Sequence, residues 1–213
     1  MIKLSFTDKM PCPSWSTQAV IHCPGARVKG RKRLADACEG CYARFGNYNR
    51  PNVKNARMHN GEDWKRDSWV MDMVQAMEKL TEFRWFDSGD AYHIDLLYKI
   101  WTVMIMTPWV KHWMPTRMYK FDKFRHPLTM MAAMKNVCVR YSSDSINGET
   151  IEGPNTSTIQ NADRIKNWDH VCMAYERDGK CGDCRMCWDK SIPVITYPQH
   201  GAPMARLDLK LTA

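Results

Sequence analysis

Hydrophobic residues recur every three or four positions in three stretches of the chain, at 62–80, 94–105 and 121–134. At this spacing the apolar side chains of a stretch lie on one face of a helix. Methionine, valine and leucine dominate the first stretch, and such side chains are more typical of a protein core than of a ligand site. We therefore predict three amphipathic helices, the second of which ends at Pro108.

Short runs rich in aromatic and β-branched residues alternate with these helices. This strand, helix, strand order predicts parallel βα units. The predicted fold class is α/β, a compact (β/α) barrel that is either complete or incomplete, with an open parallel sheet as the alternative. The runs predicted as strands lie at 83–87, 110–114, 137–141, 170–174 and 192–197, with one more at 2–6 or 18–22.

The length and composition are those of one globular domain. The chain has 213 residues, of which 44% are hydrophobic, and this content excludes a disordered chain. We divide the domain into a basic, cysteine-containing N-terminal region (1–60), a βα core (61–170) and a metal-binding C-terminal region (171–213). No apolar run approaches the roughly 18 residues of a membrane span, and the N-terminus has no secretory pattern. We expect a cytoplasmic protein with no membrane partner.

The net charge of +8 is concentrated near the N-terminus. The first 60 positions hold eleven Lys or Arg residues and three acidic residues, so the remaining charges balance. Five of the basic residues lie within seven positions, a density that favours contact with nucleic-acid phosphates. The alternative is a solvated loop that only keeps the protein soluble. The residues predicted to bind DNA are Arg27, Lys29, Arg31, Lys32 and Arg33.

Three cysteines near the C-terminus have the spacing of a metal-binding knuckle. Cys181, Cys184 and Cys187 follow a C-x2-C-x2-C pattern, and a C-x2-C turn lets two thiolates reach one ion. Either Cys172 or His200 would complete a tetrahedral site, and the sequence does not choose between them. Because protein ligands would then fill all four positions, we predict a structural Zn²⁺.

A second group of cysteines lies in the N-terminal region. Cys38 and Cys41 form another C-x2-C pair, and Cys12 and Cys23 each precede a proline that restricts the following turn. Both zinc and iron–sulfur clusters accept four thiolates. These four cysteines are therefore a candidate second metal site, for either zinc or an iron–sulfur cluster. The odd total of nine cysteines agrees with thiols or metal ligands rather than disulfides.

Three aspartates follow predicted strands. Asp87 and Asp90 come after the run 83–87, and Asp144 comes after the run 137–141. In both candidate folds the active site lies beyond the carboxyl ends of the strands, where one carboxylate can act as nucleophile and another as general acid or base. We predict these three as catalytic, with capping of the following helix as the alternative for each. A polar stretch at 147–167 follows Asp144 and is predicted to be a loop or lid.

Residues beside these aspartates are candidates for substrate binding. Ser88 and Gly89 lie between the first two aspartates, and Tyr92 and His93 follow them. Aromatic rings can stack on a planar base, as they do in nucleobase pockets. The alternative is that the rings belong to the core.

Several motifs together resemble those of small phage-encoded proteins. The motif of three cysteines followed by a histidine also resembles the zinc site of tRNA-guanine transglycosylases, a (β/α) barrel family, although the first gap here is C-x2-C where that family has C-x-C. The motifs are Cys23-Pro24-Gly25-Ala26, Cys38-x-x-Cys41-Tyr42-Ala43, Phe83-Arg84-Trp85-Phe86-Asp87-Ser88-Gly89-Asp90 and Cys181-x-x-Cys184-x-x-Cys187 with Tyr197-Pro198-x-His200.

The resemblance implies a function related to phage DNA-guanine transglycosylases. Those enzymes exchange guanine in DNA for a 7-deazaguanine base and thereby shield phage DNA from restriction. It implies that an aspartate attacks the sugar C1′ and that a second carboxylate handles protons and the base. The partners would be DNA and a 7-deazaguanine base in the host cytoplasm, and the identity of the nucleophile among the three aspartates stays open.

Two other interpretations remain open. The first is an iron–sulfur enzyme related to radical S-adenosylmethionine enzymes, which also use (β/α) barrels and clustered cysteines, although the chain has no C-x3-C-x2-C motif. The second is a non-catalytic, zinc-stapled DNA-binding protein. Metal content would separate the first interpretation from the others, and substitution of the three aspartates would test the second.

Overall fold

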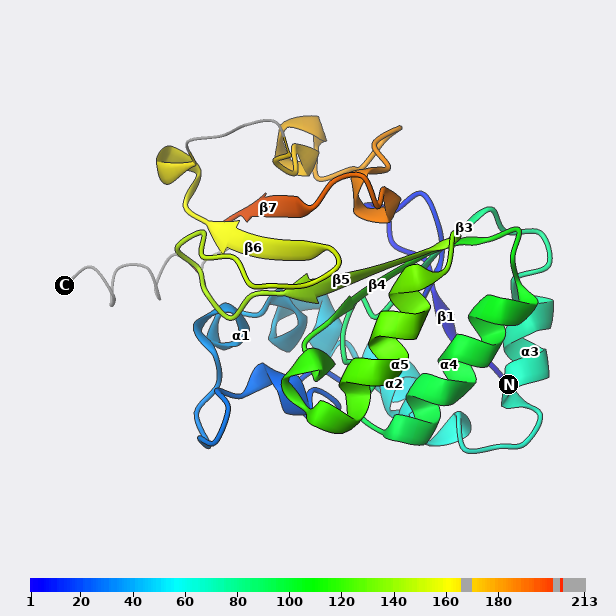
Figure 1. The fold of residues 1–213 in the computed structure, drawn as a ribbon. Helices are drawn as coiled ribbons and strands as arrows, with labels where there is room; N and C mark the ends of the chain where they lie inside the picture. Colours follow the sequence, from blue (N-terminus) through cyan, green and yellow to red (C-terminus); the bar gives the residue numbers. More distant parts are fainter. Residues whose placement is uncertain (166–169, 201–203, 205–213) are drawn as a thin grey trace.

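The computed structural model describes residues 1–165, 170–200 and 204, and it shows a mixed α/β fold (Figure 1). The strands are β1 (Leu4–Ser5), β2 (Ser14–Trp15), β3 (Glu82–Trp85), β4 (Lys111–Thr116), β5 (Val137–Ser142), β6 (Thr156–Gln160) and β7 (Val194–Pro198). The α-helices are α1 (Asp36–Glu39), α2 (Pro51–Asp63), α3 (Trp69–Ala76), α4 (Ile94–Met106) and α5 (Asp122–Ala133). Among these helices none is long and apolar enough to cross a lipid bilayer.

The seven strands form one sheet in the order in which they occur along the chain. β1 pairs antiparallel with β2, and every later pair of neighbours is parallel. The α/β prediction is therefore confirmed. A closed barrel is wrong for the described strands, because β1 and β7 lie at opposite edges of the sheet and do not pair. The two-residue antiparallel strand β1 does not offer β7 a parallel partner.

One face of the sheet packs against helices. Figure 1 shows α3, α4 and α5 together on this side. Successive residues of a strand point to opposite faces, so on β3 the rings of Phe83 and Trp85 are fully buried in the main core while Arg84 points to the other face. Trp85 lies 5.0 Å from the Phe83 ring and 6.2 Å from the Trp15 ring, measured between centroids.

The helices predicted at 94–105 and 121–134 are confirmed as α4 and α5. The helix predicted at 62–80 is confirmed only in part, as α3, because α2 ends at Asp63 and α3 begins at Trp69 and ends at Ala76. A tertiary contact explains the break. The Lys99 ammonium of α4 donates hydrogen bonds to the carbonyl oxygens of Trp64 (3.0 Å) and Arg66 (2.8 Å), which satisfies backbone acceptors where α2 ends.

Five predicted strands are confirmed as β1, β3, β4, β5 and β7. The strand predicted at 18–22 is wrong, because that segment is a turn, and 170–174 contributes only an isolated bridge from Val171 to Thr196. The polar stretch 147–167 contains β6, although its last two residues lie outside the described part. Burial of this polar strand costs little, because Thr158 Oγ1 donates to the Glu149 carbonyl (2.8 Å) and the backbone pairs with β7.

Candidate functional site

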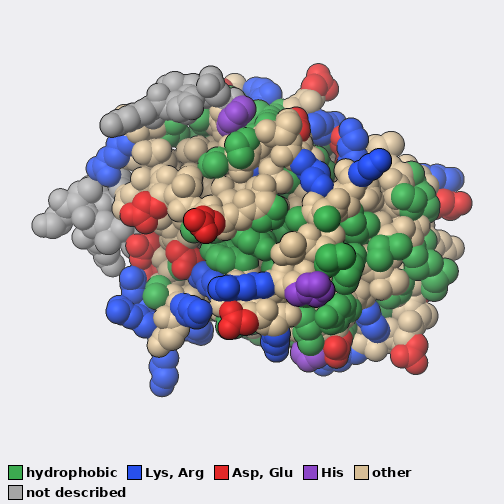
Figure 2. All heavy atoms as spheres, in the orientation of Figure 1, with side chains coloured by type: hydrophobic (Ala, Val, Ile, Leu, Met, Phe, Trp, Pro, Cys, Tyr) green, Lys and Arg blue, Asp and Glu red, His purple; other side chains and the backbone are tan. Residues whose placement is uncertain are grey.

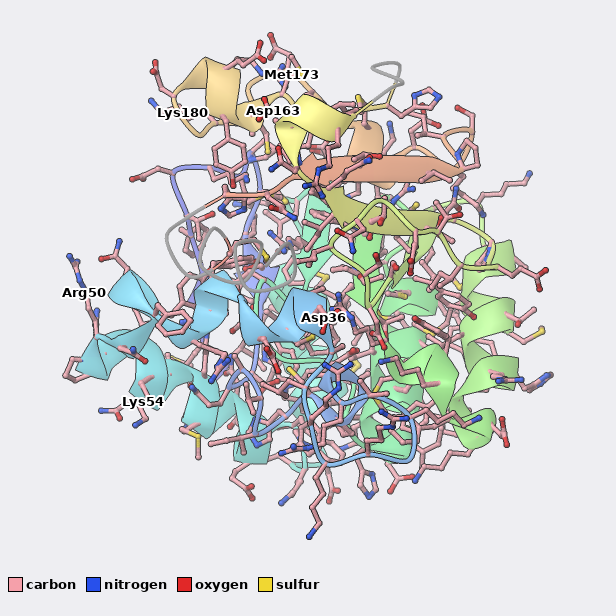
Figure 3. The ribbon with its side chains drawn as sticks, turned by 90° about the vertical axis from the view of Figure 1, so that its left-hand side faces the viewer. Asp36, Arg50, Lys54, Asp163, Met173 and Lys180 are labelled. Atoms are coloured by element: carbon pink, nitrogen blue, oxygen red, sulfur yellow. The ribbon has the colours of Figure 1, made fainter. Side chains whose placement is uncertain are left out.

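A cavity of about 480 Å³ lies at the carboxyl ends of the parallel strands. Its lining includes the residues that follow β3, residues at the ends of β4 and β5, and segments from both ends of the chain. Figure 3 looks onto this side of the molecule, where Asp36 of α1 lies below and Met173 and Lys180 of the C-terminal region lie above. The site therefore combines parts that are far apart in sequence.

The turn after β3 is tied to the loop after β2. Thr17 N donates to the Ser88 carbonyl (3.1 Å), Ser88 Oγ donates to the Thr17 carbonyl (2.8 Å), and Asp90 N donates to the His22 carbonyl (2.8 Å). Gly89 has a left-handed φ of +81°, and a Cβ there would collide with Thr17. These contacts hold Cys23, the residue after His22, beside the turn. Ser88 and Gly89 line the cavity, and their role in substrate binding stays a prediction.

Asp90 is a buried carboxylate at the cavity wall. It accepts hydrogen bonds from Thr116 Oγ1 (2.7 Å) and from the backbone N–H groups of Arg117 and Ala91 (2.8 Å each). Burial raises its pKa, and these hydrogen bonds oppose that change. The carboxylate joins the end of β3 to the end of β4.

Asp87 is buried in an ion pair beside the same cavity. Its Oδ2 lies 3.0 Å from Arg57 Nη2 of α2, and Tyr48 OH donates to the same oxygen at 3.4 Å. Its Oδ1 is buried and has no hydrogen-bond partner among the described residues. Among the described residues this oxygen is therefore the part of the Asp87 carboxylate that is left without a hydrogen bond.

Asp144 lies near the cavity but is not among the residues that line it. Its Oδ1 accepts a hydrogen bond from the Lys120 ammonium at 2.6 Å and lies 3.4 Å from Arg117 Nε, and its carbonyl accepts a hydrogen bond from Ala37 N of α1 at 3.0 Å. The backbone carbonyl thus fastens α1 to the end of β5, whereas the side chain holds the segment that follows β4. None of the three aspartates is the N-cap of an α-helix, so all three hold strand ends and loops together.

Tyr92 and His93 do not line the cavity. The Tyr92 ring stacks on the His22 ring at 4.4 Å, and its OH accepts a hydrogen bond from Trp64 Nε1 at 2.8 Å. The exposed His93 ring lies 5.5 Å from the Trp64 ring. Both rings therefore pack around Trp64, and the substrate-binding role predicted for them has no geometric support.

Three of the four N-terminal cysteines lie at the cavity wall. Cys23, Cys38 and Cys41 all line it. Burial raises the pKa of the Cys23 thiol, and the nearby Asp90, Cys38 and Cys41 raise it further. Burial also raises the pKa of Cys41. Cys12 belongs elsewhere, because it packs with Trp113, Trp188 and Cys187 on the far side of the cavity.

A hairpin explains how Cys23 and Cys38 approach each other across fourteen intervening residues. Arg27 and Leu34 form an antiparallel bridge, and Ala35 N donates to the Ala26 carbonyl at 2.8 Å. The hairpin therefore brings Ala26 and Ala35 side by side. Cys23, Ala26, Leu34, Ala35 and Cys38 pack in one apolar cluster.

The C-terminal cysteines approach the same cavity from the opposite side. Cys172, Cys181 and Cys187 line it and Cys184 does not. Burial raises the pKa of Cys187 to about 12, although a hydrogen bond with Tyr197 OH at 3.3 Å opposes the rise. His200 also lines the cavity, and its ring lies 4.5 Å from the Tyr175 ring at an interplanar angle of 38°.

Within residues 1–165, 170–200 and 204, no three His, Cys, Asp or Glu side chains stand close enough together to hold a metal ion. Both metal predictions therefore stay predictions. The donor set still fits an iron–sulfur cluster in its chemistry, because three cysteine sulfurs line one cavity and such clusters are held by thiolates. The thiol protons would be lost on binding, and metal binding is what draws such ligands around a common centre.

Arg84 and Arg57 are site residues that sequence reasoning missed. Arg84 lines the cavity, and Arg57 pairs with Asp87. The sequence holds a signal for Arg84, because a charged residue between Phe83 and Trp85 in a strand must face away from the apolar core. Arg57 had no such signal, since its partner is thirty residues away.

The predicted DNA-binding residues lie on the hairpin between Cys23 and Cys38. Arg27, Lys29, Arg31, Lys32 and Arg33 are all exposed. Figure 2 shows Lys and Arg side chains gathered at the lower left, over the blue N-terminal segment of Figure 1. The Lys120 ammonium donates to the Gly25 carbonyl at 2.7 Å and anchors the base of this hairpin. The hairpin thus stands beside the cavity.

A protein-family model for GP88, gene product 88, matches residues 3–190. The chain belongs to the GP88 family. The matched region contains all nine cysteines of this GP88 protein and the three aspartates predicted as catalytic. The family description is consistent with the bacteriophage origin that the resemblance implies. No curated protein and no solved structure matches the chain.

Proposed function

We propose that this GP88 protein is an iron–sulfur enzyme of the radical S-adenosylmethionine type, with the cluster held by Cys23, Cys38 and Cys41. The observation that carries the proposal is the hairpin bridge between Arg27 and Leu34. Radical S-adenosylmethionine enzymes carry a C-x3-C-x2-C motif, whereas this chain has fourteen residues between Cys23 and Cys38. The hairpin spans residues 27–34 of this gap. Apart from it, only the short segments 24–26 and 35–37 separate Cys23 from Cys38, and Cys38 is the first residue of the C-x2-C pair.

The position of the cysteines in the fold supports the same proposal. They line a cavity at the carboxyl ends of parallel strands that follow chain order from β2 to β7. We interpret this open sheet as an incomplete (β/α) barrel, and ligands in parallel α/β folds bind at this end. Three protein thiolates leave one iron of a four-iron cluster free for a further ligand.

When bound, such a cluster would supply one electron to a sulfonium cofactor beside it. The residues of the chain would provide the surroundings. The buried Asp90 carboxylate fixes the ends of β3 and β4 around the cavity, and Asp87 presents its free Oδ1 to a ligand N–H. The C-terminal segment with Cys172, Cys181 and Cys187 covers the opposite side and would limit the access of water.

Iron and sulfide analysis after anaerobic purification tests the proposal, together with a visible spectrum. We expect at least about four iron atoms and four sulfides per chain and a brown colour. Alanine at Cys23, Cys38 or Cys41 should remove most of this iron. Alanine at Cys138, a buried cysteine that does not line the cavity, is the matched control and should retain it. About one zinc per chain without iron would contradict the proposal.

Base exchange on DNA is the second candidate function, and one observation favours it. Asp87 and Asp90 bring two carboxylates to one cavity beside the exposed basic hairpin. In this alternative the protein is a DNA-guanine transglycosylase with a structural zinc held by Cys181, Cys184 and Cys187, with Cys172 or His200 as the fourth ligand. Exchange of labelled guanine in single- and double-stranded DNA tests it, with Asp87→Asn, Asp90→Asn and Asp144→Asn as variants. Asp144 does not line the cavity, so its variant should retain the most exchange.

A further inference from the structure

Arg84 lines the cavity, and in the described part of the chain it has no ion-pair partner. Within the described residues, no carboxylate lies within 4.0 Å of its guanidinium. We propose that Arg84 is the anion-binding residue of the cavity and that the substrate carries a carboxylate or phosphate group to it. The inference rests on the proposed function only in taking this cavity as the reaction site.

The contacts that Arg84 makes leave its charge unbalanced. Nη2 donates to Tyr42 OH at the long distance of 3.4 Å, and Nη1 lies 3.7 Å from the Met10 sulfur, which is a weak acceptor. Nε is buried and has no hydrogen-bond partner among the described residues. Because a half-buried cation without a directly paired counter-charge is costly, this arrangement favours a ligand that supplies one.

The nearest anionic side chains are committed to other partners. Asp87 pairs with Arg57, and Glu82, which shares the face of β3 with Arg84, lies 2.6 Å from Arg185 Nε. Asp90 accepts its three hydrogen bonds from β4 and its own turn. An incoming anion therefore would not have to displace an existing ion pair of Arg84.

The position of the guanidinium suits a planar or branched oxyanion. It lies over the Trp113 ring, 4.5 Å from the ring centroid, so one flat face is covered while the two Nη groups make only the weak contacts with Tyr42 and Met10. An arginine edge binds carboxylate and phosphate through two parallel hydrogen bonds. Lys9, at the same cavity, adds a second positive charge.

Thermal unfolding of the purified full-length protein tests the inference. The probes are inorganic phosphate, deoxyguanosine monophosphate and malonate, each compared with sodium chloride at equal ionic strength, with uncharged deoxyguanosine as a further control. A ligand that binds the native state raises the unfolding temperature. We expect at least one anion to do so in the natural protein and in Arg177→Met, an exposed arginine outside the cavity lining. The responding probe distinguishes phosphate from carboxylate.

In Arg84→Met the response to the anion should disappear, while the unfolding temperature in chloride alone stays equal or rises. Arg84→Lys keeps the charge but loses the paired donors, and its apparent Kd should be about tenfold weaker. An equal response in Arg84→Met, an unweakened one in Arg84→Lys, or no response in the natural protein would overturn the inference.

Iron content measured on the same samples separates this inference from the proposed function. Arg84 lies near Cys12, Cys181 and Cys187, since its charge affects all three thiols. Loss of iron in Arg84→Met would show that Arg84 serves metal-bound sulfur instead, which overturns the anion site. A protein that holds no iron but keeps the Arg84-dependent anion response would refute the cluster and leave the anion site in place.

Discussion

The two faces of the sheet are built on different physical principles. The face against α3, α4 and α5 is an apolar core in which Phe83, Trp85 and Met114 are fully buried. The face toward the cavity holds Arg84 and Trp113, and the loops around it are held by hydrogen bonds and ion pairs. The hydrophobic effect stabilises the first face, whereas the second depends on directional contacts between distant segments. Stability and function should therefore respond separately to substitution.

The largest effect on stability is expected for Trp85→Ala on the helix-covered face. Removal of this buried ring leaves a cavity beside Trp15 and Phe83, and we expect the free energy of unfolding to fall by about 5 kcal/mol. Urea denaturation measures the change. Tyr98→Ala, at an exposed position of α4, is the control and should change it by less than about 0.5 kcal/mol. Equal losses at both positions would contradict the division between core and surface.

Gly89→Ala probes the cavity face and should lower the free energy of unfolding by about 4 kcal/mol. A side chain here combines a strained positive φ with a collision against Thr17. Gly30→Ala is a matched control, because Gly30 has a similar φ of +74° but no atom within 4 Å of its added Cβ. Gly30→Ala should lower the free energy of unfolding by only about 1 kcal/mol. Only Gly89→Ala should also lower the iron content, since its turn positions Cys23.

His112 makes the helix-covered face sensitive to acid. Burial lowers the pKa of His112 from 6.5 to about 4. Its Nδ1 accepts a hydrogen bond from Trp85 Nε1 at 3.3 Å, and its Nε2 shares a hydrogen bond with Thr107 Oγ1 at 2.9 Å. Between pH 6.5 and 4 the unfolded chain binds more protons, so stability falls as the pH falls through this window, by up to about 3 kcal/mol. His112→Gln should reduce the slope of stability against pH there. The exposed His126→Gln should leave the slope unchanged.

The smallest effect on stability, and a selective effect on binding, is expected for the basic hairpin. Replacing Arg31, Lys32 and Arg33 with Gln should leave the unfolding free energy nearly unchanged, because all three are exposed. If single-stranded DNA binds here, the slope of log K against log salt should fall by about 2. Lys123→Gln with Lys135→Gln, at exposed positions in and just after α5, is the control. An equal change in that control would show that net charge alone is responsible.

The helix-covered face was largely predictable from the sequence. The stripes that formed α4 and α5, and the runs that formed β3, β4 and β5, depend on local periodicity, and local periodicity is present in the chain itself. The break between α2 and α3 was not predictable, because Lys99 reaches it from another helix. Strand β6 was missed because its Thr and Ser residues are typical of a loop. Its strand structure depends on pairing with β7, which lies more than thirty residues further along the chain.

The sequence by itself determined the α/β class, the excess of positive charge near the N-terminus and the set of cysteines and strand-end aspartates. Only the tertiary structure decided how these groups are sorted. In the folded chain a hairpin brings Cys23 and Cys38 to one cavity, whereas Cys12 packs elsewhere. Tyr92 and His93 lie away from this cavity, and Arg84 lines it. The physical reason is that periodicity specifies which face of an element is apolar, whereas the cavity is formed by contacts between segments that the sequence does not place next to one another.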